Sequence, residues 1–308
     1  PTLKSGIGTF SDKLKILKLN QKLKKKTLEA IFLESEQTTL EYLQRLGFSN
    51  AMIKDFFKPF FSGIFLETEL GTSSRMFEFV YKMFGEGHAT IPKSGIEAIP
   101  KQLFSNLKTT TFNYNTKVES LKDGKILFEN GSQLESHYTI VASEASGLIS
   151  NLKNQSIEWK SCTTLYFETE TRVINKRLIG LISKSGSLIN NIFYNSSLKS
   201  ATTPLKEILS VTVIDRRGLS NESLIEAVRT ELTELCGITA TSFIKLYNIP
   251  RALPKLQDLK YEMMPSETRL TDHLFLAGDT QLNASLNAAM ISGERAALGV
   301  IESIKSIV

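Results

Sequence analysis

The chain has few of the residues that build metal sites and disulfide frameworks, with two cysteines and three histidines among 308 residues. Cys162 and Cys236 do not have the spacing of a metal site and the histidines are scattered, so we expect no structural metal. No apolar run approaches the roughly 20 residues that a membrane-spanning helix needs, and nothing resembles a signal peptide. We therefore expect a cytoplasmic protein, and we expect no nucleic-acid partner.

What remains is the composition of a folded globular protein. Hydrophobic residues make up 41% of the sequence and charged residues 22%, and the length allows two domains. The sequence has no strand followed by a glycine-rich loop and a helix. Gly6-Ile-Gly8 is followed by a lysine-rich helical pattern and no apolar strand precedes it, so it is not a dinucleotide-binding fingerprint.

The region 4–26 carries eight lysines against one acid, Asp12, interleaved with leucines. One interpretation is a basic amphipathic helix that makes peripheral contact with an anionic membrane. The other, which the sequence favours, is an ordinary solvated helix face. Residues 1–90 as a whole are predicted to be helical, with Ser35, Ser49 and Thr72 or Ser73 as helix starts. Gly47, Pro59 and Gly85 are predicted to end helices.

The aromatic run Phe56–Phe65 follows within this helical region. It could line a tunnel for an apolar substrate, but core packing explains most of its rings better. His88 is a weak candidate for catalysis, because isolated histidines are more often structural. No catalytic residue can be named from the sequence.

Residues 109–142 have the pattern of a β-meander that returns to a central sheet. Asp123-Gly124 and Asn130-Gly131 are typical of tight hairpin turns, and Thr139–Ala142 reads as a buried strand. A second β-rich region is predicted from residue 160 to about 265. Its expected elements are strands at 161–168, 188–194, 207–214 and 241–247, and a helix at 221–236 that Gly237 closes.

The C-terminal region contains the most informative motif. The apolar run from His273 ends in Ala277-Gly278-Asp279, and a helix pattern opens at Ser285-Leu286-Asn287-Ala288 and continues through Ser292-Gly-Glu-Arg-Ala-Ala297. A buried strand would thus deliver a Gly-Asp turn to a helix N-terminus. Free backbone N–H groups and the helix dipole favour negative charge there.

This motif resembles the closing motif of FAD-dependent oxidoreductases of the amine oxidase, phytoene desaturase and protoporphyrinogen oxidase superfamily. The segment Ile91–Leu103 is similar to the family's segment joining its two domains. The resemblance implies FAD as cofactor. It also implies cofactor contacts at the following positions: Val118, Ala142, Gly278, Asp279, Leu286, Asn287 and Ala288. The alternative roles are strand packing for Val118 and capping of the last helix for Asp279.

The expected fold is α/β, with a discontinuous, incomplete FAD/NAD(P)-binding, Rossmann-like domain (91–150 and 266–308). The substrate domain would be a mixed sheet with helices (1–90 and 151–265). The strands at 138–142 and 273–277 should share one sheet. We interpret the chain as a family member that lacks about the first hundred residues, the size of the glycine-rich unit. We therefore expect it to bind FAD weakly or not at all. The apolar surface left open on the strand at 138–142 and on the last helix should favour self-association or require a partner chain.

The expected function of the complete protein is that of an FAD-dependent oxidoreductase acting on an apolar or amphipathic organic substrate. Amine oxidases of the family place an aromatic residue just before the last helix, where this chain has Ser285. That difference favours desaturase-like chemistry over amine oxidation. The alternative is a cofactor-free, non-catalytic module that binds hydrophobic ligands.

Overall fold

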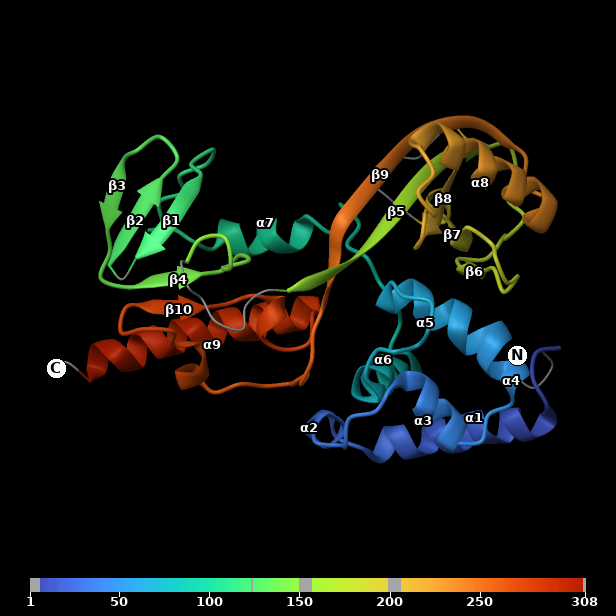
Figure 1. The fold of residues 1–308 in the computed structure, drawn as a ribbon, viewed down its shortest axis with the longest axis horizontal. Coiled ribbons are helices and arrows are strands. Elements are labelled where there is room, and N and C mark those ends of the chain that lie inside the picture. The colour runs from blue at the N-terminus through green and yellow to red at the C-terminus, as the bar shows by residue number, and fades with distance from the viewer. Residues whose placement is uncertain (1–5, 123, 150–156, 199–205, 307–308) are drawn as a thin grey trace. The chain divides into compact units, whose positions relative to one another are not determined.

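The computed structural model describes residues 6–122, 124–149, 157–198 and 206–306, which form two compact units (Figure 1). Unit 1 comprises Pro1–Thr27, Ser35–Leu107 and Trp159–Leu253. Unit 2 comprises Leu28–Glu34, Lys108–Glu158 and Pro254–Val308. The mixture of sheets and helices is the α/β class expected from the sequence.

The units divide the chain differently from the expected domains at several boundaries. Residues 91–107 group with unit 1, although α7 (Ala98–Ser105) buries none of its residues. Residues 28–34 and 254–265 group with unit 2. Contacts between distant residues explain why these two segments join unit 2. The ring centroids of Phe32 and Tyr261 lie 5.9 Å apart, and Met263 packs with Leu282.

The N-terminal part of unit 1 is helical, as predicted for this region. Its elements are α1 (Phe10–Lys25), α3 (Thr39–Arg45), α4 (Asn50–Met52), the π-helix η2 (Ile53–Phe57), α5 (Lys58–Phe65) and α6 (Ser74–Glu86). A short helix of unit 2, α2 (Leu28–Phe32), follows α1 in the sequence.

The aromatic run forms the centre of this helical core. Phe57 and Phe61 are fully buried and Phe65 is 2% exposed, and all three pack in one cluster with Phe77. Adjacent rings meet at preferred geometries, with Phe57 and Phe48 edge to face at 4.8 Å. Core packing is therefore confirmed for these rings.

Two of the predicted helix starts are confirmed and several helix signals were misread. Ser49 and Ser73 are N-caps, whereas Ser35 caps no helix. Pro59 lies in the first turn of α5, directly after the π-helix η2, and it does not end a helix. Gly85 lies inside α6, and Gly87 is the residue that caps the end of that helix.

The second part of unit 1 is a five-stranded sheet covered by one helix. The strand order is β6-β7-β8-β5-β9. The strands are β5 (Glu158–Thr169), β6 (Gly180–Leu181), β7 (Ile189–Tyr194), β8 (Glu207–Val213) and β9 (Ala240–Lys255). Helix α8 (Asn221–Cys236) places Leu224, Val228 and Leu232 against the strands (Figure 1).

Unit 2 contains the predicted meander and the two strands that were predicted to share a sheet. The strands β1 (Val118–Lys122), β2 (Lys125–Phe128) and β3 (Gln133–Glu135) form an antiparallel sheet. Gly124 and Gly131 have φ of 76° and 81°, as their turns require. Asp123, the other residue of the first turn signal, lies outside the described residues.

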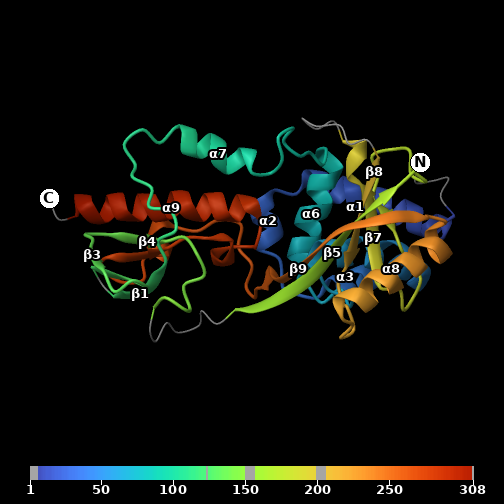
Figure 2. The ribbon, with the colours of Figure 1, turned by 90° about the horizontal axis from the view of Figure 1, so that it is seen from above.

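Strand β4 (Thr139–Val141) pairs in parallel with β10 (Leu274–Leu276), so the prediction that these two segments share a sheet is confirmed. The helix α9 (Leu286–Lys305) packs along this pair (Figure 2). Short 3-10 turns complete the chain: η3 (Asn195–Ser197), η4 (Pro265–Thr268) and η5 (Asp279–Gln281). Among the described residues, no helix combines the length and hydropathy needed to cross a membrane.

Candidate functional site

The candidate site lies in unit 2, where the parallel strands end. Because β4 and β10 are parallel, their carboxyl ends reach the same edge of the sheet, and Ala277 N–H donates to the carbonyl oxygen of Val141 at 2.9 Å. The residues that follow these strands, Ala142 and Gly278, therefore lie at that edge. Ala142 is exposed.

Val118 lies beside the same strands. It packs against a buried cluster that includes Val141 and Leu276, so the packing role considered for its side chain is present. The β1–β2 register shifts between Val118 and Ser120, an irregularity often found next to functional sites. The structure thus brings Val118 together with the ends of β4 and β10.

The turn after β10 depends on a glycine and on a buried serine of α9. Gly278 has φ 136°, a conformation that residues with a Cβ rarely adopt. Its N–H donates to Ser292 Oγ at 2.9 Å, and the same oxygen lies 2.9 Å from the Gly278 carbonyl oxygen. Ser292 is fully buried. This contact fixes the turn against the second turn of the helix.

The loop between the strand and the helix is organised by the backbone of Asp279. Its carbonyl oxygen accepts from the N–H groups of Leu282 at 3.3 Å and Ala284 at 3.0 Å. Ala284 has φ 61°, which is uncommon for a residue with a side chain. The Asp279 carboxylate is half-buried and makes no hydrogen bond or ion pair to the part of the chain that the structure describes.

The start of α9 is capped by Ser285 and not by Asp279. Ser285 Oγ accepts from Ala288 N–H at 3.0 Å, and the Ser285 carbonyl accepts from Ala289 N–H at 3.1 Å. The N–H groups of Leu286 and Asn287 have no acceptor among residues 6–122, 124–149, 157–198 and 206–306. The capping role considered for Asp279 is therefore filled by Ser285, and two N–H groups remain available to a ligand.

The three residues at this helix start have different environments. Leu286 is 53% exposed and Asn287 is exposed, whereas Ala288 is fully buried beside Met263 and Leu282. The unpaired N–H groups and the helix dipole favour a negatively charged or electron-rich group. A neutral or anionic acceptor atom could bind here without any titratable partner.

Residues that were not predicted as site residues tie α9 and the loop before it to the segment 260–262. Arg295 binds Glu262 through two hydrogen bonds, Nε to Oε1 at 3.0 Å and Nη2 to Oε2 at 2.9 Å. This contact lowers the pKa of the Glu262 carboxyl. Asn283 is buried, its Nδ2 donates to the Lys260 carbonyl oxygen at 2.8 Å, and its Oδ1 has no partner in the described residues.

The sequence contained a signal for only some of these contacts. A serine before a helix start is a standard N-cap, so the role of Ser285 was readable from the pattern. Ser292 and the Arg295–Glu262 pair depend on tertiary contacts that spacing does not encode. The Arg295 side chain is only 24% exposed because Glu262 binds it.

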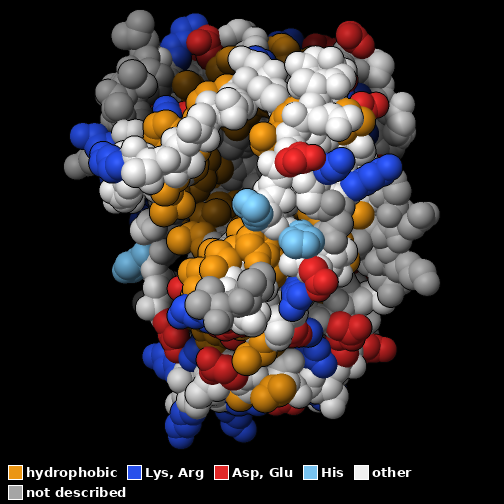
Figure 3. All heavy atoms as spheres, turned by 90° about the vertical axis from the view of Figure 1, so that its left-hand side faces the viewer, with side chains coloured by type: hydrophobic (Ala, Val, Ile, Leu, Met, Phe, Trp, Pro, Cys, Tyr) orange, Lys and Arg blue, Asp and Glu red, His pale blue; other side chains and the backbone are white. Residues whose placement is uncertain are grey.

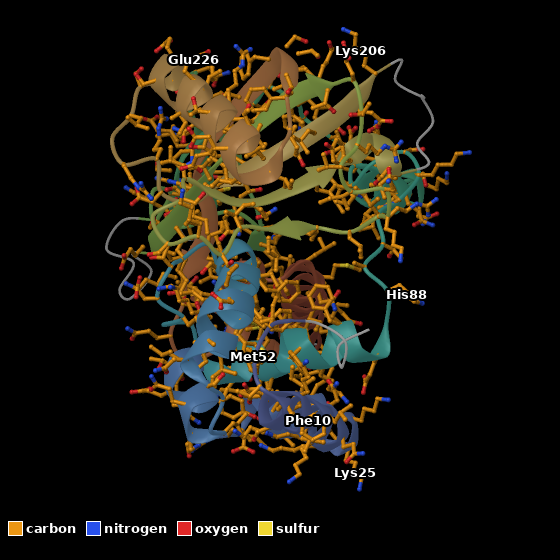
Figure 4. All side chains as sticks on the ribbon, turned by 90° about the vertical axis from the view of Figure 1, so that its right-hand side faces the viewer. Phe10, Lys25, Met52, His88, Lys206 and Glu226 are labelled. Carbon is orange, nitrogen blue, oxygen red and sulfur yellow. The ribbon has the colours of Figure 1, made fainter. Side chains whose placement is uncertain are left out.

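His88 lies elsewhere, in the exposed segment after α6, where its side chain projects from the chain (Figure 4). Within the described residues, no three of the His, Cys, Asp and Glu side chains converge as metal ligands would. The geometry therefore centres the candidate site on Asp279 and the start of α9.

Comparison with known proteins places this geometry in context. Residues 6–301 match the family model for flavin containing amine oxidoreductases. No curated protein sequence gives a significant match.

Three solved structures illustrate the structural similarity. A candidate protoporphyrinogen oxidase from Exiguobacterium sp. 255-15 has a TM-score of 0.65 at 16% identity, covering 96% of this chain and 73% of its own. Wild-type putrescine oxidase bound to putrescine gives 0.66 at 12% identity, with coverages of 97% and 77%. A fatty acid isomerase from P. acnes that produces CLA gives 0.67 at 11% identity, with coverages of 98% and 76%. At these identities the similarity establishes the fold.

Proposed function

The chain belongs to the family of flavin containing amine oxidoreductases, and on this premise we propose that the protein is an FAD-dependent oxidoreductase acting on an apolar or amphipathic organic substrate. The observation that carries the proposal is the arrangement at the edge of the β4–β10 sheet. The half-buried Asp279 carboxylate and the N–H groups of Leu286 and Asn287 have no partners in the described residues.

The residues of the site fit a flavin nucleotide. Asp279 has only acceptor atoms when ionised, which suits the hydroxyl groups of a ribityl or ribose chain. Gly278 and Ala142 present little side chain at the strand ends, so a ligand can approach the backbone closely. Val118, with Ala142, would contact the adenosine part of the cofactor.

FAD, when bound, would accept a hydride equivalent from the substrate. The N–H groups of Leu286 and Asn287 are preorganised at the positive end of α9, so they stabilise negative charge without moving. Ala288 would contribute through its small size. Its N–H is bonded to Ser285, so its small buried side chain, and not its amide, keeps the helix start close to the loop.

The substrate class rests on two further arguments. Ser285 occupies the position just before α9 where amine oxidases of the family place an aromatic residue, and here it serves as the N-cap. This favours desaturase-like chemistry over amine oxidation. The fold shared with a fatty acid isomerase is compatible with an apolar substrate.

A titration of the purified 308-residue protein with FAD tests the cofactor proposal. We expect weak binding, seen as quenching of flavin fluorescence at high protein concentration, because these residues contain no glycine-rich pyrophosphate loop. Asp279→Asn should weaken the binding further, whereas Asp272→Asn, an exposed carboxylate paired with Arg269, should not.

Three results would count against parts of this proposal. A yellow preparation with stoichiometric flavin would contradict the weak affinity. Equal FAD affinities of the Asp279→Asn variant and the unmodified protein would remove Asp279 from the site. Absence of any FAD binding, together with saturable binding of an apolar dye, would favour the alternative function of a cofactor-free module for hydrophobic ligands. The exposed apolar residues of α9 support that alternative.

A further inference from the structure

Helix α1 has one face that is fully used by the core of unit 1. Ile16, Leu19 and Leu23 are at most 7% exposed and pack among the aromatic residues of the helical core. Two of its lysines are also used on this side, because Lys22 and Lys26 bind the buried Glu78 at 3.3 and 2.5 Å. The contacts of this face hold α1 against the core of unit 1.

The opposite face of α1 is apolar and exposed. Phe10 is 71% exposed, Leu14 43% and Leu17 47%. Their spacing of four and three residues places them in one row, on the side of the helix away from Ile16 and Leu23. A solvated helix face would carry polar residues here. The exposed row therefore does not fit a solvated helix face, which is the interpretation that the sequence favoured.

Lysines border this row. Lys18, Lys24 and Lys25 are exposed, and their side-chain ammonium groups make no ion pair or hydrogen bond to any described residue. Figure 4 shows Phe10 and Lys25 on α1 at the lower edge of the view, with Lys25 directed away from the protein. The one acid of the helix, Asp12, is fully buried and bound by Thr9 and Ser49, so it does not offset the positive charge outside.

A hollow of about 250 Å³ adjoins the row, between α1 and the end of α6. Leu17 and Tyr81 contribute apolar walls, and Asn20 and Lys24 contribute polar ones. The outer surface of α1 is therefore an apolar strip with an adjacent recess and a cationic border.

We propose that this face of α1 docks unit 1 on an anionic lipid membrane. An amphipathic helix with aromatic and leucine side chains on one strip and lysines beside it binds the membrane interface through two additive terms. The apolar strip enters the region between headgroups and acyl chains, and the lysines bind the negative surface. The cationic border favours a membrane over an uncharged protein surface. The proposal is independent of the redox function.

Vesicle co-sedimentation of the purified protein tests this inference. We expect binding to phosphatidylcholine vesicles that contain phosphatidylserine, weaker binding to phosphatidylcholine alone, and a decrease with added salt. The triple variant Lys18→Gln, Lys24→Gln, Lys25→Gln should lower the partition coefficient about a hundredfold. The triple variant Phe10→Ser, Leu14→Ser, Leu17→Ser should lower it about tenfold or more.

Matched variants in the same unit control for charge and hydrophobicity. Lys54→Gln, Lys176→Gln, Lys184→Gln removes three exposed lysines elsewhere, and Val173→Ser, Leu178→Ser, Ile179→Ser removes three exposed apolar residues. Both should bind vesicles like the unmodified protein, and circular dichroism should show every variant folded. The proposal is overturned if the unmodified protein does not sediment with anionic vesicles, or if the α1 variants bind no less than their controls.

Discussion

The two units of the molecule bury their apolar side chains in different ways. Unit 1 has two large clusters, one around Phe57 and Phe61 and the other around Leu165 and Val211, and these four residues are fully buried. Unit 2 has only small clusters among the described residues, such as that of Phe275 with Ala277 and Ala296. Figure 3 faces unit 2 and shows hydrophobic side chains gathered at its surface.

Helix α9 shows the reason for this difference most clearly. Its buried residues are all small: Ala288, Ser292, Ala296, Gly299 and Ser303. Its large apolar residues lie on the opposite side, and they form the outer face of α9: Leu286, Met290, Ile301 and Ile304, each between 45% and 53% exposed. Small residues allow close packing on β10, but they bury little apolar area.

This comparison teaches that unit 1 is organised around large buried clusters, whereas the described part of unit 2 has small clusters and an exposed apolar face on α9. Stability effects should therefore be largest in unit 1, and effects on self-association should be confined to unit 2. The following variants test whether the two units differ in this way.

The largest effect is expected from the aromatic core of unit 1. Phe57→Ala should lower the free energy of unfolding by about 3–5 kcal/mol, because it leaves a cavity in a fully buried cluster. Phe10→Ala, at a side chain that is 71% exposed, should cost less than about 1 kcal/mol. Urea unfolding followed by circular dichroism gives both values. Equal effects would contradict the buried core.

A smaller effect is expected at Asp12, which joins α1 to the loop before α4. Its carboxylate accepts from the backbone N–H and hydroxyl of Thr9 and of Ser49, at 2.7 to 2.8 Å. Burial alone would raise the pKa of this carboxyl, but these hydrogen bonds hold it well below its ordinary value. Asp12→Asn should cost about 2–3 kcal/mol at neutral pH.

The pH dependence provides a second measurement at Asp12. The folded protein binds the proton less tightly than the unfolded chain. The stabilisation is therefore complete above the ordinary carboxyl pKa and is lost as the pH falls through the folded value. The unmodified protein should lose more stability than Asp12→Asn between neutral and acidic pH. The Asp55 carboxylate makes no hydrogen bond or ion pair to a described residue, so Asp55→Asn should retain the pH dependence of the unmodified protein.

The sequence predicted best those features that local patterns determine. Helix α8 has the predicted bounds, Asn221–Cys236, and ends at Gly237, and the meander turns at its glycines. That β4 and β10 share a sheet followed from recognising the meander and the closing motif.

Features that depend on distant residues were missed. Strand β9 continues to Lys255 through Pro250 and Pro254, because it is an edge strand where proline is tolerated. The π-helix η2 has no sequence signature. At the candidate site, the Gly-Asp turn was readable, but the contact between Gly278 and Ser292 was not.

A pair of glycines in unit 2 gives the next smaller effect. Gly278→Ala should destabilise by about 1–2 kcal/mol, because φ 136° is strained for any residue with a Cβ. Gly293→Ala in α9 should stabilise by about 0.5–1 kcal/mol, because a Cβ there meets no atom within 4 Å and alanine favours the helix. Hydrogen exchange of the β10 amides would report both changes. The same sign at both positions would contradict the turn geometry.

The smallest effect on stability, and the one most specific to unit 2, is expected on the outer face of α9. We propose that this face and the exposed edge strand β4, where Ile140 is 40% exposed, mediate self-association. Met290→Lys with Ile301→Lys should change the free energy of unfolding by less than about 0.5 kcal/mol, because both side chains are about half exposed. It should shift the protein toward monomer in sedimentation velocity over a series of concentrations.

Tyr114→Lys with Leu134→Lys introduces the same charges at exposed residues elsewhere in unit 2, and should leave association unchanged. If the unmodified protein remains monomeric at every concentration, the apolar face of α9 does not bind a second copy. The two units would then differ only in how they bury their apolar side chains.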